Sequence, residues 1–560
     1  MKFKKIIFAV LFIPAFLSCN KKFDNLLNDP NGVPPSAANA DLLLNNVQLS
    51  FASFFDQASD FGMQLTRMIH FYGPKYDNGW TPQDYDGIWS TAYTSVIKNA
   101  DAVIPIADAQ KKYVHEGMAK IMKAYTVMTL VDMFGNVPMS EANLGIDNTN
   151  PKDDGGASVY AAAIALLDGA ISDLSKTPAS YPGSQDLLYG ASSSSGKAKW
   201  ITLAKTLKLR AYLQTRLVDN TAASKITTLL TENDLINSQA NDFEFKYSTK
   251  QANPNSRHPR YNGNYTTTGS AGDYMAHYYM WCLTQEKGSF NNNVATDNSD
   301  PRTRYYFYRQ RTNNGELTQV TSSCSGSAPP AWYPSGMTWC NLPAGFWGRD
   351  HGNGTGIPPD GPLRTTVGIY PFGGDFDANQ GTSVSLNRGG QGAGIQPIWL
   401  SVFTDFLRAE AALTLGTTGD PRALLQSGIR KSFTKVFGFP ATITVTVSST
   451  YVPSQTRQDN YVNNVVSLYD NASTTAGKLD VIAKECYIAL WGNGVDAYNM
   501  YRRTGKPGNM QYMVQVQDPG PFIRSHYYPA VHVERNQNAT QKSSVAVQVF
   551  WDNNPAGFIK

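Results

Sequence analysis

The chain has 560 residues, of which 41% are hydrophobic and 16% are charged, as expected for a globular protein. Its formal net charge of +4 includes three lysines within the first five residues, so the remaining sequence carries only +1. This balance excludes a strongly basic nucleic-acid-binding surface.

The N-terminus has the parts of a secretory signal. Lysines at the start precede an apolar run ending at Leu17, which is too short to span a bilayer. Ser18 stands directly before Cys19, and this arrangement resembles the lipobox of a bacterial lipoprotein. The resemblance implies a signal peptide over residues 1–18 and, after cleavage, a tether over residues 19–40 that is lipidated at Cys19. An ordinary secretory signal, in which the cysteine falls there by chance, is the alternative.

Apolar residues at helical spacing predict antiparallel helix pairs in the first half of the chain. The first predicted helix spans residues 42–55 and continues through residues 61–71. Further helices are predicted over residues 83–107, 113–134, 157–174 and 199–217. Small residues among the large ones favour tetratricopeptide-like stacking, although the strict 34-residue consensus is absent. After Cys19 we expect no apolar run that approaches the roughly 20 residues of a membrane-spanning helix.

The middle of the chain, residues 241–396, differs from both flanks. Gly, Pro, Asn and aromatic residues accumulate there, with one short predicted helix over residues 273–283. Long loops of this kind are usually functional or disordered, and the many Trp and Tyr residues argue against disorder. Helices return over residues 399–415, 421–437, 479–491 and 495–503.

These observations predict a mainly α protein with a tetratricopeptide-like helical repeat body and a large irregular, loop-rich insertion. We expect a single domain, residues 41–560. It comprises a helical repeat half (41–240), an irregular ligand-binding insertion (241–396) and C-terminal helices with a tail (397–560).

Two cysteines suggest a disulfide. Cys324 and Cys340 flank a loop that contains Pro and Trp, so a bond between them is plausible in an oxidising compartment. Cys486 lies in an apolar helical run and is expected to be a buried thiol. No cysteine pair has the short spacing of a zinc site.

Short motifs follow one another along nearly the whole chain. They are Asn28-Asp29-Pro30-Asn31, Tyr85-Asp86-Gly87-Ile88-Trp89, Asp132-Met133-Phe134-Gly135-Asn136-Val137-Pro138, Asp300-Pro301-Arg302, Ala409-Glu410-Ala411, Arg502-Arg503-Thr504-Gly505 and Tyr527-Tyr528-Pro529. In this order they resemble the SusD/RagB family of outer-membrane lipoproteins of the Bacteroidetes type, within its SusD-like nutrient-binding branch. We interpret Asn99, Asp101, Glu410 and Arg502 as residues that cap or pair helices, not as catalysts.

The resemblance implies a lipid-anchored protein of the outer membrane that faces the cell exterior. It implies further that the protein captures oligosaccharides and sits as a lid over a SusC-like, TonB-dependent transporter. The same architecture handling peptides or other nutrients is the alternative.

Sugar rings have apolar faces on which flat aromatic side chains stack, and two loops offer such side chains. The candidate ligand-binding residues are Tyr76, Asn78 and Trp80 in the first loop, and Trp332, Tyr333, Trp339, Trp347, Arg349 and Asp350 in the second. For any single Trp, packing against the body is at least as good an interpretation. We expect at least one of the group to contact ligand.

Enzymatic motifs are missing from the sequence. There is no His-Glu-x-x-His pair, Gly-x-Ser-x-Gly elbow or phosphate-binding Gly-Lys-Ser/Thr loop. We therefore expect no catalytic residues, no cofactor and no nucleic-acid partner. A surface glycosidase would need two converging carboxylates, which sequence alone does not reveal. Asp153-Asp154 or Asp375-Phe376-Asp377 leave room for a structural calcium ion, although surface solvation is the simpler interpretation.

Overall fold

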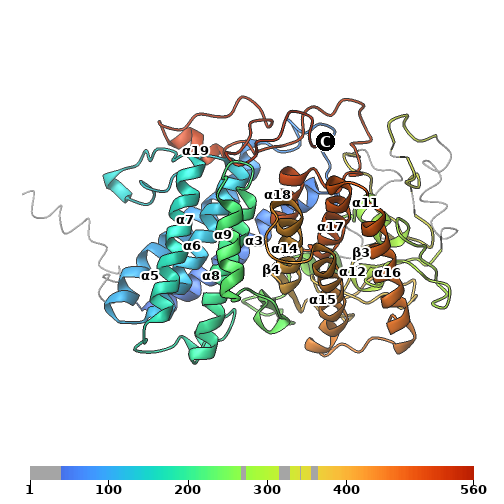
Figure 1. The fold of residues 1–560 in the computed structure, drawn as a ribbon, viewed down its shortest axis with the longest axis horizontal. Helices are drawn as coiled ribbons and strands as arrows, with labels where there is room; N and C mark the ends of the chain where they lie inside the picture. The colour runs from blue at the N-terminus through green and yellow to red at the C-terminus, as the bar shows by residue number, and fades with distance from the viewer. Residues whose placement is uncertain (1–38, 267–272, 314–327, 334, 341, 355–362) are drawn as a thin grey trace, which may run out of the picture.

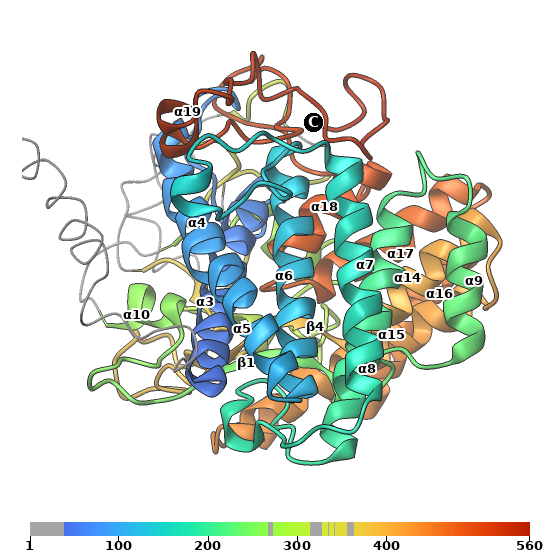
Figure 2. The ribbon, with the colours of Figure 1, turned by 90° about the vertical axis from the view of Figure 1, so that its left-hand side faces the viewer.

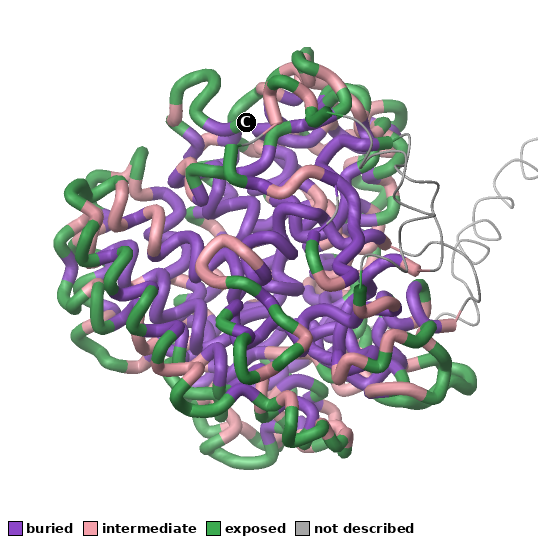
Figure 3. The backbone as a smooth tube through the Cα atoms, turned by 90° about the vertical axis from the view of Figure 1, so that its right-hand side faces the viewer, coloured by how far each residue is buried: buried purple, intermediate pink, exposed green. Residues whose placement is uncertain are grey.

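A computed structural model describes residues 39–266, 273–313, 328–333, 335–340, 342–354 and 363–560 (Figure 1). Helices dominate both flanks of the chain, and irregular segments fill the region between them. The predicted mainly α class is therefore confirmed. The interior of the molecule is filled by buried backbone (Figure 3). The buried residues come from both helical regions and from much of the described irregular region.

The first helical region is a layer of long helices that pack in sequence order. It contains α3 (Ala40–Leu65), α5 (Lys98–Ala109), α6 (Tyr113–Phe134), α7 (Gly156–Ser175), α8 (Ser194–Gln214) and α9 (Ala222–Glu232). Figure 2 shows α5, α6, α7 and α8 side by side. The Asn39 side chain caps α3 by accepting a hydrogen bond from the Asp41 amide. Gly135, at a φ of 84°, ends α6.

The predicted helix over residues 83–107 is interrupted. A 3-10 turn (Pro82–Tyr85) leads into α4 (Asp86–Ser90), and a π-helical segment (Thr91–Ile97) joins α4 to α5. Trp89, in α4, is buried.

The second helical region returns to the first through its last long helix. It contains α14 (Ser401–Leu415), α15 (Pro421–Thr442), α16 (Gln455–Asn471), α17 (Thr475–Ala489) and α18 (Gly494–Thr504), followed by the short α19 (Ala530–Arg535) in the tail. Helix α14 packs on α15 and α17, whereas α18 packs on α3. At that crossing the two backbones touch, because a Cβ added at Gly62 would lie 2.1 Å from the carbonyl oxygen of Gly494. The α3–α18 contact ties the two regions together.

Among the longer helices that the structure describes, α9 and α16 were not predicted. Helix α9 is rich in Thr, and most of α16 is polar, with Asn, Gln, Asp and Arg. In α16 the buried residues Tyr461, Val462, Val465, Val466 and Tyr469 form one stripe at helical spacing. The polar residues between them mask this stripe in the sequence.

Short strands mark the ends of the insertion. Strand β1 (Phe243–Tyr247) pairs antiparallel with β4 (Gly394–Trp399), from Phe243 opposite Trp399 to Tyr247 opposite Gly394. Inside it, β2 (Phe307–Tyr308) pairs with β3 (Thr366–Val367), and α10 (Pro259–Tyr265), α11 (His277–Thr284) and α12 (Thr303–Tyr306) are short helices. No strand was predicted here. All six residues of β4 are buried and show no alternating pattern, whereas β1, with the sequence Phe-Glu-Phe-Lys-Tyr, does alternate and was missed nonetheless.

Of the four residues interpreted as capping or pairing helices, Asp101 and Glu410 do so, as predicted. Asp101 pairs with Lys123 across α5 and α6, and Glu410 accepts two 2.8 Å hydrogen bonds from Arg503. Arg502 differs, since it forms no ion pair among the described residues. Its guanidinium lies 3.7 Å from the Tyr498 ring centroid, and it donates to the Arg524 carbonyl at 2.6 Å.

Helix α7 is unusually apolar. Within the part of the chain that the structure describes, it is the one helix long and apolar enough to cross a membrane, with a mean hydropathy of 1.4. The expectation that no run after Cys19 approaches this length is therefore wrong. Helix α7 packs against α6 and α8, with Val159 and Leu167 buried (Figure 2). A core helix passes the same test of length and composition.

Candidate functional site

The two aromatic loops predicted from the sequence meet in the structure, and a third segment joins them. The Gly352 amide donates to the Phe71 carbonyl at 3.0 Å, which connects the first loop to the second. The third segment contacts both loops. The Val514 amide donates to the His351 carbonyl at 3.0 Å, and the Tyr76 amide donates to the Pro519 carbonyl, also at 3.0 Å. Residues 510–522 were not predicted to take part. We call this junction of the first loop, the second loop and residues 510–522 the aromatic site.

Tyr76 lies at the centre of the junction and is buried. Its hydroxyl accepts a 2.9 Å hydrogen bond from Arg67 and lies 3.2 Å from Nε2 of His351. Burial raises the pKa of Tyr76 to about 12, against a smaller opposing effect of Arg67. The hydroxyl therefore stays protonated at neutral pH and fixes the first loop against the second.

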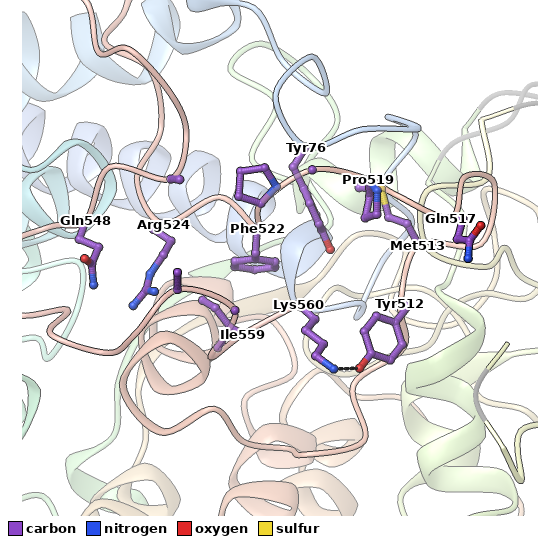
Figure 4. Close-up of a pocket in the computed structure, with 15 residues that line it drawn as sticks. Tyr76, Tyr512, Met513, Gln517, Pro519, Phe522, Arg524, Gln548, Ile559 and Lys560 are labelled. Atoms are coloured by element: carbon purple, nitrogen blue, oxygen red, sulfur yellow. Dashed lines mark hydrogen bonds between the residues drawn. The ribbon is translucent and has the colours of Figure 1, made fainter. Parts of the chain in front are cut away.

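Tyr76 also lines a cavity of about 340 Å³ formed largely by the tail. Figure 4 shows the rings of Tyr76 and Phe522 with Pro519 and Ile559 around this space. At one end the Lys560 ammonium contacts the Tyr512 hydroxyl. The cavity is mainly apolar and adjoins the first loop.

Trp80 is partly exposed, and other aromatic rings pack against its indole ring. The ring centroids of Phe71 and Phe61 lie 4.7 and 5.1 Å away, both in edge-on geometry. Edge contacts of this kind favour a fixed ring position. Asn78, two residues earlier, is exposed.

The second loop presents three partly exposed aromatic side chains: Trp332, Tyr333 and Trp339. The rings of Tyr333 and Trp339 meet edge to face at 4.9 Å. The Tyr333 hydroxyl donates to Oδ1 of Asp350 at 3.1 Å, and Gln511 donates to the same oxygen at 2.6 Å. Asp350 thus anchors the aromatic pair to the third segment.

The remaining candidates lie inside. Asp350 is 5%, Arg349 4% and Trp347 1% exposed. The Arg349 guanidinium lies 5.2 Å from the ring centroid of Tyr72, which is 43% exposed. Sequence reasoning did not select Tyr72, although it begins the same aromatic loop. Buried candidates position the site, and the partly exposed ones are available to a ligand.

Histidines near the aromatic site are neutral. Burial, assisted by the nearby positive charge of Arg349, lowers the pKa of His70 to about 3. Burial also holds the pKa of His351 well below its usual value, as do Arg67 and His70. Because neither ring titrates near neutral pH, their charge does not change in that range.

This burial predicts an acid-sensitive stability. Between pH 6.5 and about 3, an unfolded chain binds a proton at His70 that the folded chain does not, so the free energy of unfolding falls as the pH falls. At pH 5 the loss is about 2 kcal/mol for such a histidine. Urea unfolding at pH 7 and at pH 5 measures this effect. Between the two pH values, the free energy of unfolding of the wild type should fall by about 2 kcal/mol more than that of His70→Phe. An equal loss in both proteins would contradict the assignment.

Of the two cysteines in the predicted disulfide, the structure describes Cys340. Cys340 is disulfide-bonded, whereas Cys324 and Cys19 lie outside the described residues, so their roles stay predictions. Cys486 is a buried free thiol, as predicted.

The calcium candidates have other partners. Asp375 pairs with Arg388 and Asp377 with Arg309, both at 2.5 Å, while Asp154 accepts amide hydrogen bonds from Met139 and Ser140. Among the described residues no cluster of three His, Cys, Asp or Glu residues could hold a metal ion.

Comparisons with known proteins fit this architecture. A family model described as "Starch-binding associating with outer membrane" matches residues 33–328, and one described as "Susd and RagB outer membrane lipoprotein" matches residues 394–550. No curated protein sequence matches the chain.

Solved structures share the fold at low sequence identity. A chitin-binding protein is 18% identical, with a TM-score of 0.64 over 92% of this chain and 100% of its own. A SusD homologue from Bacteroides fragilis NCTC 9343 is 18% identical, with a TM-score of 0.64 over 92% and 99%. A chitin-binding SusD homologue from Flavobacterium johnsoniae is 18% identical, with a TM-score of 0.58 over 91% and 99%. With a family model covering more than half of its length, the chain belongs to the SusD/RagB family of outer-membrane lipoproteins.

Proposed function

We propose that this protein captures oligosaccharides at the aromatic site and delivers them to a TonB-dependent transporter, over which it sits as a lid. The observation that carries the proposal is the group of partly exposed rings, Trp80, Trp332, Tyr333 and Trp339, around a buried polar framework. Lipid on Cys19 would hold the body at the outer face of the membrane. Starch- and chitin-binding relatives support glycans as the ligand class.

Stacking gives the site a physical basis. A sugar ring presents C–H groups on its faces, and an aromatic ring with a fixed orientation binds such a face at little cost in conformational entropy. Trp80 and Tyr333 are held by neighbouring rings and by Asp350, so they need little rearrangement to bind. Exposed polar groups such as Asn78 and Gln515 can bond the sugar hydroxyls around the rings.

The enzyme alternative has less support. The family is one of binding proteins, and Asp350 is occupied by Tyr333 and Gln511. A carboxylate that already accepts two hydrogen bonds in the interior is poorly placed to protonate a glycosidic oxygen. We therefore expect the protein to bind its ligand without cleaving it.

Calorimetric titration of residues 20–560 tests the proposal directly. We expect binding to chito- or malto-oligosaccharides, and a loss of about tenfold in affinity, or about 1.4 kcal/mol, for Trp80→Ala, Trp332→Ala or Trp339→Ala. Loss of one stacking ring removes contacts with the ligand while the other two rings remain.

Tyr113→Ala is the matched control. Tyr113 is also a partly exposed aromatic residue, but it begins α6, a helix of 22 residues or about 33 Å whose far end lies by the aromatic site. Its substitution should leave affinity unchanged. Binding of peptides instead of glycans would favour the peptide-importing alternative, whereas release of shortened sugars would indicate a glycosidase. Equal affinities in the wild type and all three Trp variants would refute the aromatic site.

A further inference from the structure

A second and larger cavity lies on the C-terminal side of the insertion. Its volume is about 800 Å³, within the range of about 300–1,000 Å³ that is usual for ligand sites. It lies between the loop 287–298 and the N-terminal half of α16, together with residues 450–454. None of the aromatic-site residues lines it.

Neutral polar side chains form its accessible wall. They are Thr296, Asn298, Ser454, Thr456, Asn460 and Asn464, all exposed. Side-chain amides and hydroxyls offer both donors and acceptors, the complement that a ligand rich in hydroxyl groups requires. Val294 and Val452 add small apolar surfaces that suit the C–H groups of a sugar.

The charged groups of the floor are neutralised in pairs. Arg457 lies 3.1 Å from Asp297, and Lys287 lies 2.9 Å from Glu485, which is fully buried. A fixed ion pair has no net charge to offer to an anion or a cation. The cavity therefore favours a neutral polar ligand over a phosphate, a sulfate or a metal ion.

The cavity adjoins one edge of the aromatic site. The Thr338 hydroxyl, next to Trp339, donates to the Gln285 side chain at 2.6 Å. Gln285 is two residues from Lys287 in the cavity floor, and consecutive Cα atoms are about 3.8 Å apart. One extended chain molecule could therefore reach both places.

We propose that this cavity is a second saccharide-binding site, which holds a neutral segment of the same polysaccharide chain that the aromatic site captures. The inference rests on the proposed function. Two linked sites raise the overall affinity for a long ligand, because the second contact forms at a high effective concentration. A short ligand, which occupies one site at a time, gains nothing from this.

The double variant Thr456→Ala/Asn460→Ala tests the second site. Both residues are exposed on α16, one turn apart, so alanine should preserve the helix. We expect the wild type to bind an oligosaccharide of about eight units at least tenfold more tightly than the disaccharide of the same series. In the double variant this advantage should vanish, while affinity for the disaccharide stays the same.

Asn463→Ala is the control, since Asn463 is exposed on α16 but does not line the cavity. Unchanged unfolding midpoints for both proteins would show that the fold is intact. If the wild type binds long and short ligands equally, or the double variant keeps the full advantage of length, the second site is refuted and the aromatic site stands. If the wild type binds no oligosaccharide of either length, both proposals fail together.

Discussion

Replacing Asp132 by Ala should destabilise the protein by about 3–5 kcal/mol, the usual cost of breaking a buried, hydrogen-bonded ion pair. Asp132 is 1% exposed. One carboxylate oxygen accepts from Arg210 at 3.0 Å and from Asn499 at 2.7 Å. The other accepts from Trp551 at 2.9 Å and from the Tyr160 hydroxyl. This single side chain therefore joins α6 to α7, α8, α18 and the tail.

Alanine at this position would leave several buried donors without an acceptor and would leave Arg210 with Asp496 alone. Chemical unfolding monitored by tryptophan fluorescence measures the loss. Asp459→Ala is the matched control, because Asp459 also pairs with an arginine, Arg430, but at a surface position where both side chains are at least 40% exposed. There the expected cost is below about 1 kcal/mol. Similar losses for the two variants would contradict the structural role given to Asp132.

The second large effect is expected at the crossing of α3 and α18. A methyl group on Gly62 would lie 2.1 Å from the Gly494 carbonyl oxygen, and that oxygen belongs to backbone that no side-chain rotation can move. Gly62→Ala must therefore push the helices apart. We expect a loss of about 2–3 kcal/mol in the free energy of unfolding, typical of overpacking in a tight core.

Gly169→Ala separates this effect from the helix propensity of alanine. Gly169 lies within α7, and its added methyl group would meet only the end of the Lys120 side chain at 3.9 Å. There alanine should stabilise the helix by up to about 1 kcal/mol. Opposite signs for the two substitutions are the expected result, and stabilisation by both would show that α3 and α18 do not touch at Gly62.

Local signals explain which helices could be predicted. Helix α6 begins and ends at the predicted residues, Tyr113 and Phe134, because it is a long, largely apolar run and Gly135 follows it. Helix α16 escaped prediction because its buried stripe is narrow and lies among polar residues that also suit a loop. Strand β4 was missed for a different reason, since a fully buried strand shows no alternation.

The aromatic site shows the same limit at the level of single residues. Composition selected both loops, but it could not distinguish the buried Tyr76 and Trp347 from the partly exposed Trp80 and Tyr333. For Tyr76 the burial depends on residues 510–522, which lie far along the chain and carry weak sequence signals. Gln511, for example, holds Asp350 across 161 positions.

The helical class, the family and the two aromatic loops could be predicted from the sequence. These features rest on periodicity, end signals and short motifs, which act between residues only a few positions apart. Three features could not be predicted from local sequence: the contact of α3 with α18, the pairing of β1 with β4 and the position of the polar cavity. Each of these joins segments more than a hundred residues apart, where burial and close approach depend on the packing of the whole chain.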